Sequence, residues 1–185
     1  MEKKSLVYLT GFMGAGKSTI GSILANTLGW DYYDLDRLIE AECKKKISDI
    51  FKENGEKKFR EIESELLKKI STKKFTVISL GGGTIANEMN LQILKDTGTI
   101  VYLKSSLDSI YKRVRFKRDR PVLKLDESGE PIMKENFIDS VAKIFESRKP
   151  YYEQADVIID TDNTNVGASV DKLVRYIERL NRKER

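Results

Sequence analysis

A glycine-rich run near the N-terminus carries the residues best suited to phosphate chemistry. The pattern Gly-x-x-x-x-Gly-Lys-[Ser/Thr], typical of a phosphate-binding loop, is met by Gly11-Phe12-Met13-Gly14-Ala15-Gly16-Lys17-Ser18-Thr19. Its glycines let the backbone turn tightly, so that successive N–H groups point inward at an anion. Lys17 would reach the β- and γ-phosphates of a nucleotide, and the Ser18 hydroxyl would bind Mg²⁺. The sequence therefore predicts a site for a nucleoside triphosphate, and a glycine-rich turn without a ligand is the weaker alternative.

Two acids form a second group of chemically competent residues. Asp34 and Asp36 follow a short aromatic run, 30–33, that is typical of a strand. Two residues of a strand that are separated by one other residue point to the same side, and the carboxyl end of a strand is where open α/β sheets bind ligands. One of the acids could instead cap the helix that begins near Arg37, and Asp36 is the stronger candidate for that role. Both interpretations stay open.

Three consecutive glycines end another apolar run. Gly81-Gly82-Gly83 follow residues 75–80, which have the composition of a buried strand. Because glycine loses more backbone freedom on folding than any other residue, a simple turn rarely needs three of them. At the end of a central strand they would let a ligand approach the backbone closely. A flexible turn without a ligand is the alternative.

Arginines supply the remaining candidates for binding an anion. Arg60 stands three residues before Glu63 on an expected helix, and taken alone this spacing favours an exposed ion pair. A basic stretch between 113 and 120 carries Arg113, Arg115, Lys117, Arg118 and Arg120. Pro121 and a polar segment follow it, which indicates a mobile loop. Such a segment is either a solvated basic face or a lid over phosphates.

Alternating strand-like and helical segments must position these residues. Strands are expected at 5–9, 30–33, 75–80, 99–103 and 156–160. Helices are expected at 18–28, at 37–70 with a break at Asn54-Gly55, at 90–96, from Ser105 or Ser106 to Val114, at 136–155 and at 168–180. This alternation predicts an α/β fold with a five-stranded parallel sheet and helices on both faces. The phosphate loop, the two acids and the three glycines would then meet at one edge of the sheet.

Composition narrows the possible classes of protein. The 185 residues suit a single domain, 1–185, and 39% hydrophobic with 34% charged residues suits a globular chain. The apolar runs are too short for a membrane span, and the N-terminus leads directly into the expected first strand without a signal peptide. The single cysteine, Cys43, fits a reducing compartment. A cytoplasmic protein is therefore expected. The absence of histidine excludes a histidine metal site or triad. The net charge of +5 is scattered among acids, which disfavours a nucleic-acid groove.

Read from the residues alone, the chain is a small-molecule kinase with an unnamed acceptor. Its motifs together resemble the shikimate kinase family, in order and over nearly the whole chain. Beyond the phosphate loop they comprise Asp34-Leu35-Asp36, Gly55-Glu56, Phe59-Arg60 with Glu63, Gly81-Gly82-Gly83, Arg120-Pro121-Val122-Leu123 and Arg148…Tyr151…Ala155-Asp156. The resemblance implies a three-layer P-loop kinase fold, a substrate-binding helical segment at about 35–70 and a mobile lid at about 115–135. It also implies transfer of the ATP γ-phosphoryl group to the 3-hydroxyl of shikimate, in the chorismate pathway toward aromatic amino acids.

The resemblance implies roles for individual residues. On the nucleotide side, Arg120 would move onto the phosphates with the lid, Ser18 would bind Mg²⁺ directly, and Asp34 would contact the ion through water. The ATP phosphates would be held by Lys17 and by the loop residues Gly14, Ala15, Gly16, Lys17, Ser18 and Thr19. On the acceptor side, the carboxylate of shikimate would be clamped by Arg60 and Arg148. Asp36 would bind its hydroxyls and act as general base, and the Gly82 amide would contact it. The catalytic residues are thus expected to be Lys17, Asp36 and Arg120.

Two departures from the family pattern and two rival functions complete the prediction. Leu35 is apolar where Ser or Thr is common, and the segment between Arg120 and Arg148 is several residues longer than the usual lid. The adenine contacts are placed, from location only, at Arg113 and at the turn 161–165.

One rival function is that of a related kinase for another small hydroxy acid such as gluconate, and the other is that of a non-catalytic nucleotide-binding switch. A monomer without a nucleic-acid or membrane partner is expected.

Overall fold

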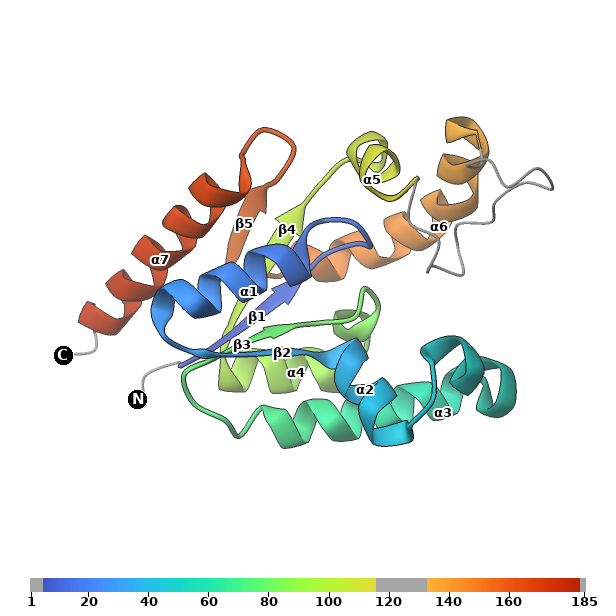
Figure 1. Ribbon diagram of the computed structural model, residues 1–185, viewed down its shortest axis with the longest axis horizontal. Coiled ribbons are helices and arrows are strands. Elements are labelled where there is room, and N and C mark those ends of the chain that lie inside the picture. The colour runs from blue at the N-terminus through green and yellow to red at the C-terminus, as the bar shows by residue number, and fades with distance from the viewer. Residues whose placement is uncertain (1–4, 116–132, 184–185) are drawn as a thin grey trace.

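Five parallel strands form a sheet at the centre of the molecule (Figure 1). The computed structural model describes residues 5–115 and 133–183. In chain order the elements are β1 (Leu6–Thr10), α1 (Lys17–Leu28), β2 (Asp31–Asp34), α2 (Leu35–Cys43), α3 (Ile47–Ile70), β3 (Thr76–Ser79), the 3-10 helix η1 (Thr84–Ala86), α4 (Glu88–Thr97), β4 (Thr99–Lys104), α5 (Leu107–Val114), α6 (Lys134–Tyr152), β5 (Val157–Asp160) and α7 (Val166–Lys183). The predicted alternation of strands and helices is confirmed.

The strand order β2-β3-β1-β4-β5 places the first strand in the middle of the sheet. Every residue of β1 and of β3 is buried, because helices cover both faces of the sheet. Leu9 pairs with Ser79 of β3 and with Val101 of β4, so the carboxyl ends of these three strands lie together. The phosphate loop and the three glycines follow directly from two of those ends.

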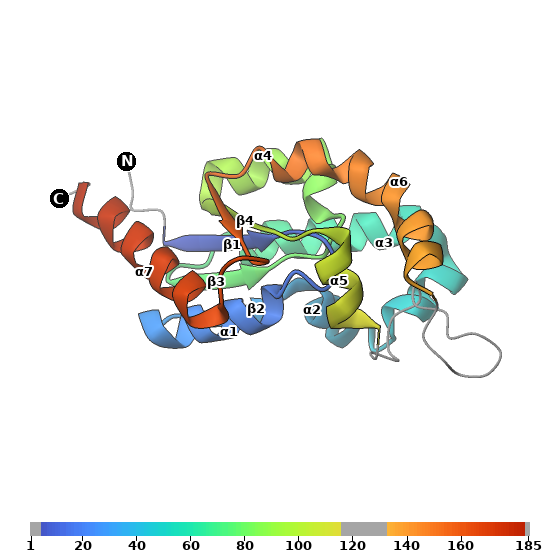
Figure 2. The same ribbon diagram turned by 90° about the horizontal axis from the view of Figure 1, so that it is seen from above.

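Two hydrophobic clusters hold the layers together. One contains Val7 and Leu9 of β1 with the apolar sides of α1 and α7. The other contains Leu6 and Tyr8 of the same strand with side chains of α3, α4 and α6. Figure 2 shows α1 on one face of the sheet and α4 on the opposite face. Alternate side chains of β1 therefore belong to the two clusters on opposite faces of the sheet, as expected for a three-layer sandwich.

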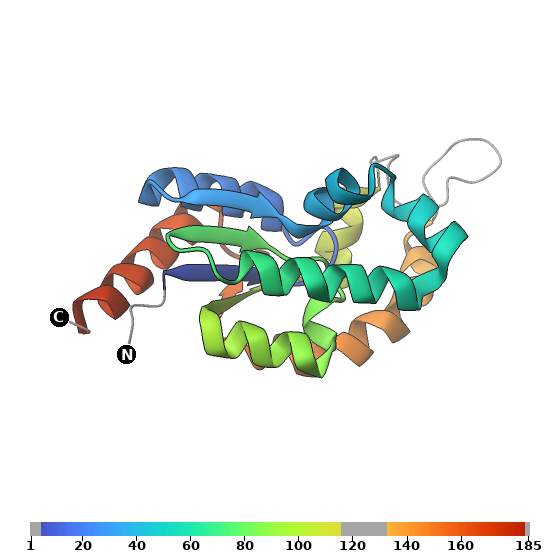
Figure 3. The same cartoon turned by 90° about the horizontal axis from the view of Figure 1, so that it is seen from below.

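The helical segment between β2 and β3 contains the predicted break. Gly55 has φ 75° and ψ 170°, which interrupts α3 between two helical halves. The second half is anchored by buried Leu66, Leu67 and Ile70, and Figure 3 shows it lying alongside the sheet. The half that precedes Gly55 lies beyond the carboxyl edge of the strands (Figure 3). This placement brings α2 and the middle of α3 next to the edge where the chemically competent residues gather.

The geometry at the two acids corrects the sequence prediction. Asp34 is the last residue of β2 and also the N-cap of α2, because its side chain accepts a hydrogen bond from the Arg37 N–H at 3.3 Å. Asp36 therefore lies in the first turn of α2 and does not continue the strand. The acid that caps the helix is Asp34, whereas the sequence favoured Asp36. The prediction that both acids share one side of a strand is therefore wrong, because β2 ends at Asp34, two residues before Asp36.

Part of the predicted lid lies outside the described residues. Residues 116–132 are not described, and they include Arg120 and most of the segment 115–135. On the carboxyl side of this gap, Lys134 begins α6 and pairs with Asp108 of α5 at 2.7 Å. In 5–115 and 133–183, no helix combines the length and the apolar character needed to cross a membrane.

Candidate active site

The phosphate loop connects β1 to α1 in a conformation that requires its glycines. Gly11, Gly14 and Gly16 all have positive φ, and Gly16 is the N-cap of α1 with φ 97°. A side chain at Gly11 would also place its Cβ 2.6 Å from the backbone carbonyl of Leu103. The loop thus delivers its amides to the positive end of a helix, which is a ready-made anion site.

The lysine of the loop is held above the loop backbone. Lys17 Nζ donates hydrogen bonds to the carbonyls of Gly11 at 2.8 Å and of Phe12 at 3.1 Å. The ammonium group is therefore held at the first two residues of the loop. An anion bound by the loop amides would meet this positive charge at short range.

Ser18 and Asp34 meet at the end of β2. The Ser18 hydroxyl donates to the Asp34 carboxylate at 2.9 Å, although the residues are 16 positions apart. Both offer hard oxygen ligands, which Mg²⁺ prefers, and Mg²⁺ usually keeps several waters and substrate phosphates in its shell. Among residues 5–115 and 133–183, no cluster of three or more His, Cys, Asp or Glu could hold a metal unaided. The residues present therefore fit a magnesium ion that shares its coordination with a nucleotide.

A hydrogen-bond chain that the sequence analysis missed supports the start of α1. Tyr32 donates to the Ser79 hydroxyl at 3.0 Å, and Ser79 donates to the Lys17 carbonyl at 3.0 Å. Burial raises the pKa of the Tyr32 phenol, so it stays protonated as a donor. Gly21 makes the approach possible, because a Cβ there would lie 2.7 Å from the Tyr32 ring. No local pattern could have revealed this chain, since it joins β2, β3 and α1.

The glycine triplet lies against the side chains of two predicted site residues. A Cβ at Gly81 would lie 2.8 Å from Asp36 Oδ1, and one at Gly83 would lie 2.7 Å from Arg60 Nη2. The positive-φ glycines among the described residues are Gly11, Gly14, Gly16, Gly29 and Gly55, so the triplet needs no left-handed residue. A carboxylate and a guanidinium thus lie close to the backbone of its outer glycines, and a side chain at either position would displace them. The sequence had predicted close approach of a ligand at this place.

Arg60 is fixed by two carboxylates of its own helix. Its Nη1 donates to Glu63 at 2.8 Å and its Nη2 to Glu56 at 3.2 Å. Glu63 is fully buried and also accepts a hydrogen bond from the Thr84 hydroxyl at 2.6 Å, so the exposed pair expected from spacing alone is wrong. Burial opposes the charge of Arg60, but Glu63 and then Glu56 outweigh it and raise the pKa of the guanidinium. Arg60 therefore remains cationic in a defined orientation.

A cavity of about 400 Å³ lies between α3 and α6. Its lining residues are Glu56, Arg60, Gly83, Ala86, Asn87, Ser147, Arg148 and Tyr151. Arg60 and Arg148, 88 positions apart in the sequence, face this one space from different helices. Two guanidinium groups on one small cavity favour a ligand that carries a carboxylate or a phosphate.

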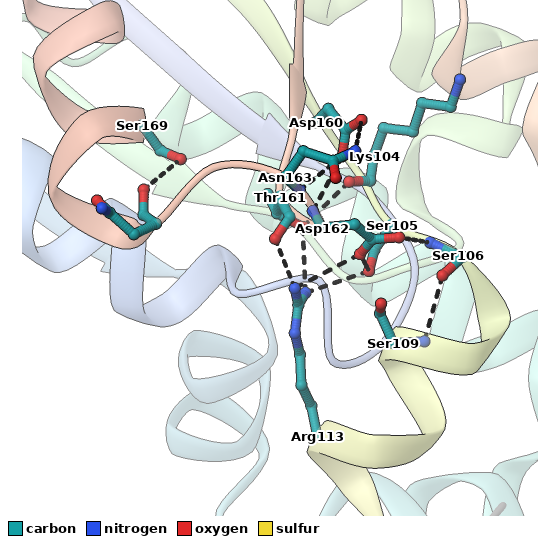
Figure 4. A network of polar contacts seen from close by, with 11 residues as sticks. Lys104, Ser105, Ser106, Ser109, Arg113, Asp160, Thr161, Asp162, Asn163 and Ser169 are labelled. Carbon is teal, nitrogen blue, oxygen red and sulfur yellow. Dashed lines mark hydrogen bonds and ion pairs between the residues drawn. The ribbon is translucent and has the colours of Figure 1, made fainter.

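Arg113 reaches the turn that follows β5 (Figure 4). Its Nη2 donates to the Thr161 carbonyl at 2.6 Å and lies 3.5 Å from Asp162. Burial acts to raise the pKa of Asp162, but hydrogen bonds from Ser105 and Ser106 outweigh it and lower that pKa to about 2. The two regions named from location as adenine contacts therefore lie against each other.

Comparison with known proteins decides the family. A sequence model described as "Shikimate kinase" matches residues 13–178. The chain belongs to the shikimate kinase family. A shikimate kinase of Chlorobaculum parvum is 45% identical over 179 residues, which cover 97% of this chain and 95% of the relative.

Solved structures of shikimate kinases have the same fold. The enzyme from Acinetobacter baumannii in complex with shikimate has a TM-score of 0.84 and 30% identity, covering 95% of this chain and 93% of that one. The enzyme from Bacteroides thetaiotaomicron has a TM-score of 0.81 and 34% identity, covering 94% of this chain and 98% of that one. The predicted P-loop kinase fold and membership of a family of ATP-dependent kinases are confirmed.

The structure divides the predicted site residues into two groups. Lys17, Ser18 and Asp34 meet around the phosphate loop. Asp36 and Arg60 pack against the glycine triplet, and Arg148 comes close to Gly82, since a Cβ there would lie 3.6 Å from Arg148 Nη1. Arg120 lies outside the described residues. The pairing of Glu63 with Arg60 was predicted, but its burial was not, and Thr84, Tyr32, Ser79 and Tyr152 were not assigned supporting roles from the sequence.

Proposed function

We propose that this chain transfers the γ-phosphoryl group of ATP to the 3-hydroxyl of shikimate. The observation that carries the proposal is the placement of Arg60 and Arg148 on one cavity. A Cβ at Gly82 would lie 3.6 Å from Arg148 Nη1 and 3.7 Å from the carbonyl oxygen of Gly11, so the phosphate loop is close to this arginine. A guanidinium fork matches the geometry of a carboxylate, and two of them would bind the acceptor at its acidic end. The cyclic hydroxy acid would then present its hydroxyl toward the nucleotide.

On the nucleotide side, the chain would act mainly by positioning and charge. The amides of residues 14–19 and the Lys17 ammonium would hold the ATP phosphates, and Arg120 would approach them from the lid. Ser18 would bind Mg²⁺ directly and Asp34 through a water, which the hydrogen bond between them supports. A bound ion would neutralise charge on the phosphate oxygens. Arg113 and the turn 161–165 would border the adenine.

On the acceptor side, Asp36 is the residue for proton transfer. Its carboxylate packs against Gly81, at the carboxyl edge of the sheet where the phosphate loop also lies. Asp36 would accept the proton of the attacking hydroxyl, and the Gly82 amide would contact the acceptor. In phosphoryl transfer the remaining requirement is alignment of the hydroxyl with the γ-phosphorus, which the arginine clamp would provide.

The direct test is ADP release from Mg·ATP with shikimate, beside parallel reactions with gluconate, quinate and no acceptor. Release stimulated by shikimate alone is the expected result, with shikimate 3-phosphate as the product identified by NMR. Stimulation by gluconate would retain the kinase chemistry and change the acceptor. ATP binding without stimulation by any of these acids would favour a nucleotide-binding switch.

The proposal includes the setting of the reaction. The product would enter the chorismate pathway toward aromatic amino acids, in the cytoplasm, and the chain would act as a monomer without nucleic-acid or membrane partners. Gel filtration at working concentration checks the oligomeric state. Activity lost on chelation and regained with added Mg²⁺ checks the requirement for the metal.

A further inference from the structure

Because glycine has no functional side chain, the triplet Gly81-Gly82-Gly83 can be hydrogen-bonded only through its backbone groups. The Gly81 carbonyl accepts a hydrogen bond from the Thr84 N–H at 3.2 Å, and the Gly83 carbonyl accepts one from the Ala86 N–H at 3.1 Å. Both are local bonds of the turn into η1. The central carbonyl, of Gly82, is held differently: it accepts a bond of 2.5 Å from the hydroxyl of Tyr152, 70 residues further along the chain.

Tyr152 is itself rigidly placed. It is fully buried at the end of α6, and its ring stacks on Tyr102 of β4 with centroids 5.1 Å apart and planes 23° from parallel. Burial raises the pKa of its phenol, and the charge of Arg148 opposes that shift, so the hydroxyl remains a donor at neutral pH. The hydrogen bond thus joins the triplet to a fixed point in the core.

Tyr152 also belongs to the same helix face as Arg148. The two residues are four positions apart on α6, so their side chains lie one above the other. A Cβ at Gly82 would lie 3.6 Å from Arg148 Nη1 and 3.8 Å from the Tyr152 hydroxyl, so both side chains converge on one glycine. The tyrosine is therefore placed to set the distance between the triplet and the arginine.

We propose that Tyr152 is a positioning residue for the acceptor: its hydroxyl fixes the peptide between Gly82 and Gly83 relative to Arg148. Because a peptide unit is planar, holding its carbonyl oxygen also fixes its N–H on the opposite side. Gly83, which lies against Arg60, supplies the N–H of this peptide, and Gly81, which lies against Asp36, directly precedes Gly82. The Tyr152 hydroxyl would therefore maintain the relative positions of Asp36, Arg60 and Arg148. Small displacements of groups that bind and orient a substrate lower the reaction rate strongly. The inference rests on the proposed function, with shikimate as acceptor.

The test compares Tyr152→Phe with Tyr102→Phe. Each variant removes one hydroxyl from the same stacked pair, and no described residue is hydrogen-bonded to the Tyr102 hydroxyl. For Tyr152→Phe we expect the KM for shikimate to rise about tenfold, which is the loss of one buried hydrogen bond at about 1.4 kcal/mol per factor of ten. The KM for ATP should stay within about twofold of wild type, and Tyr102→Phe should leave both constants nearly unchanged.

The outcomes separate this inference from the function itself. A wild type that releases no ADP with shikimate would overturn the proposed function, and this inference with it. An active wild type whose Tyr152→Phe variant keeps its KM for shikimate would overturn the inference alone, as would an equal rise in both KM values, which indicates a general structural role. If Tyr152→Phe does not fold, hydrogen–deuterium exchange of wild type decides: the peptide covering 81–87 should be as protected as β3, and exchange as fast as in an exposed loop would contradict the proposal.

Discussion

The nucleotide end and the acceptor end of the site are built in different ways. At the nucleotide end, the residues that would face the phosphates are consecutive, from Gly11 to Thr19, and the fold adds Asp34 beside them. At the acceptor end, Asp36, Arg60, Gly82 and Arg148 come from α2, α3, the β3–η1 turn and α6. The first end is specified by local backbone conformation, and the second exists only when four elements pack together.

This difference predicts different consequences of substitution. The nucleotide end is tied into the sheet through Tyr32, Ser79 and Ser18. At the acceptor end, Arg60 is held by the buried Glu63 and the exposed Glu56. Arg148, by contrast, forms no ion pair with any residue in the described ranges. Substitutions at the acceptor end should therefore separate acceptor binding and turnover from ATP binding.

The largest expected effect is that of Asp36→Asn. Loss of the proton acceptor should lower kcat by about 10²- to 10⁴-fold, because that is the usual contribution of a general base. The Kd for ATP, measured by calorimetry, should remain within about twofold, since Asp36 lies in α2 beside Gly81 and is not part of the phosphate loop 11–19. Asp31→Asn, at the opposite end of the preceding strand, is the matched control and should keep wild-type turnover. Equal losses of ATP affinity and turnover would mean that Asp36 is structural.

An intermediate effect is expected for Arg148→Lys. The substitution keeps the charge but removes the bidentate fork, so the KM for shikimate should rise about tenfold, or about 1.4 kcal/mol, while the KM for ATP changes little. Lys149→Arg on the same helix is the control, because Lys149 does not line the cavity. The melting temperature should be unaffected in both. An unchanged KM for shikimate in Arg148→Lys would remove this arginine from the acceptor site.

The smallest expected effect is that of Asp162→Asn, which removes the carboxylate beside Arg113 and depends on pH. The pKa of Asp162 is lowered to about 2 in the folded chain, so its contribution to stability is present above about pH 4 and is lost as the pH falls toward 2. Asp162→Asn should lower the free energy of unfolding by about 1 to 2 kcal/mol at pH 7, and this difference should shrink toward pH 2.5. Urea unfolding at several pH values measures it. A difference that is constant with pH would contradict the assignment to the Asp162 charge.

Much of the fold was predictable because its signals are local. The buried run of β1, the phosphate loop and the start of α1 follow one another without interruption, so hydrophobic pattern and glycine spacing specify them together. The break in α3 was visible as Gly55. The first turn of α2 was predicted less well, because capping by Asp34 ended the strand before Asp36, and capping competes with strand geometry at such junctions.

The sequence by itself determined that this chain binds a nucleotide, has a parallel α/β sheet and carries the motifs of its family. Only the tertiary structure decided that Glu63 is buried against Arg60 and Thr84, and that Asp36 and Arg60 lie close to the backbone of Gly81 and Gly83. It alone also placed the Tyr152 hydroxyl on the Gly82 carbonyl, where the sequence had drawn attention to Tyr151. The physical reason is the distance along the chain over which each kind of interaction acts. Backbone preferences and periodicity act over a few residues, whereas burial and hydrogen bonding between α3, α6 and the glycine triplet depend on segments that meet only when the layers have packed.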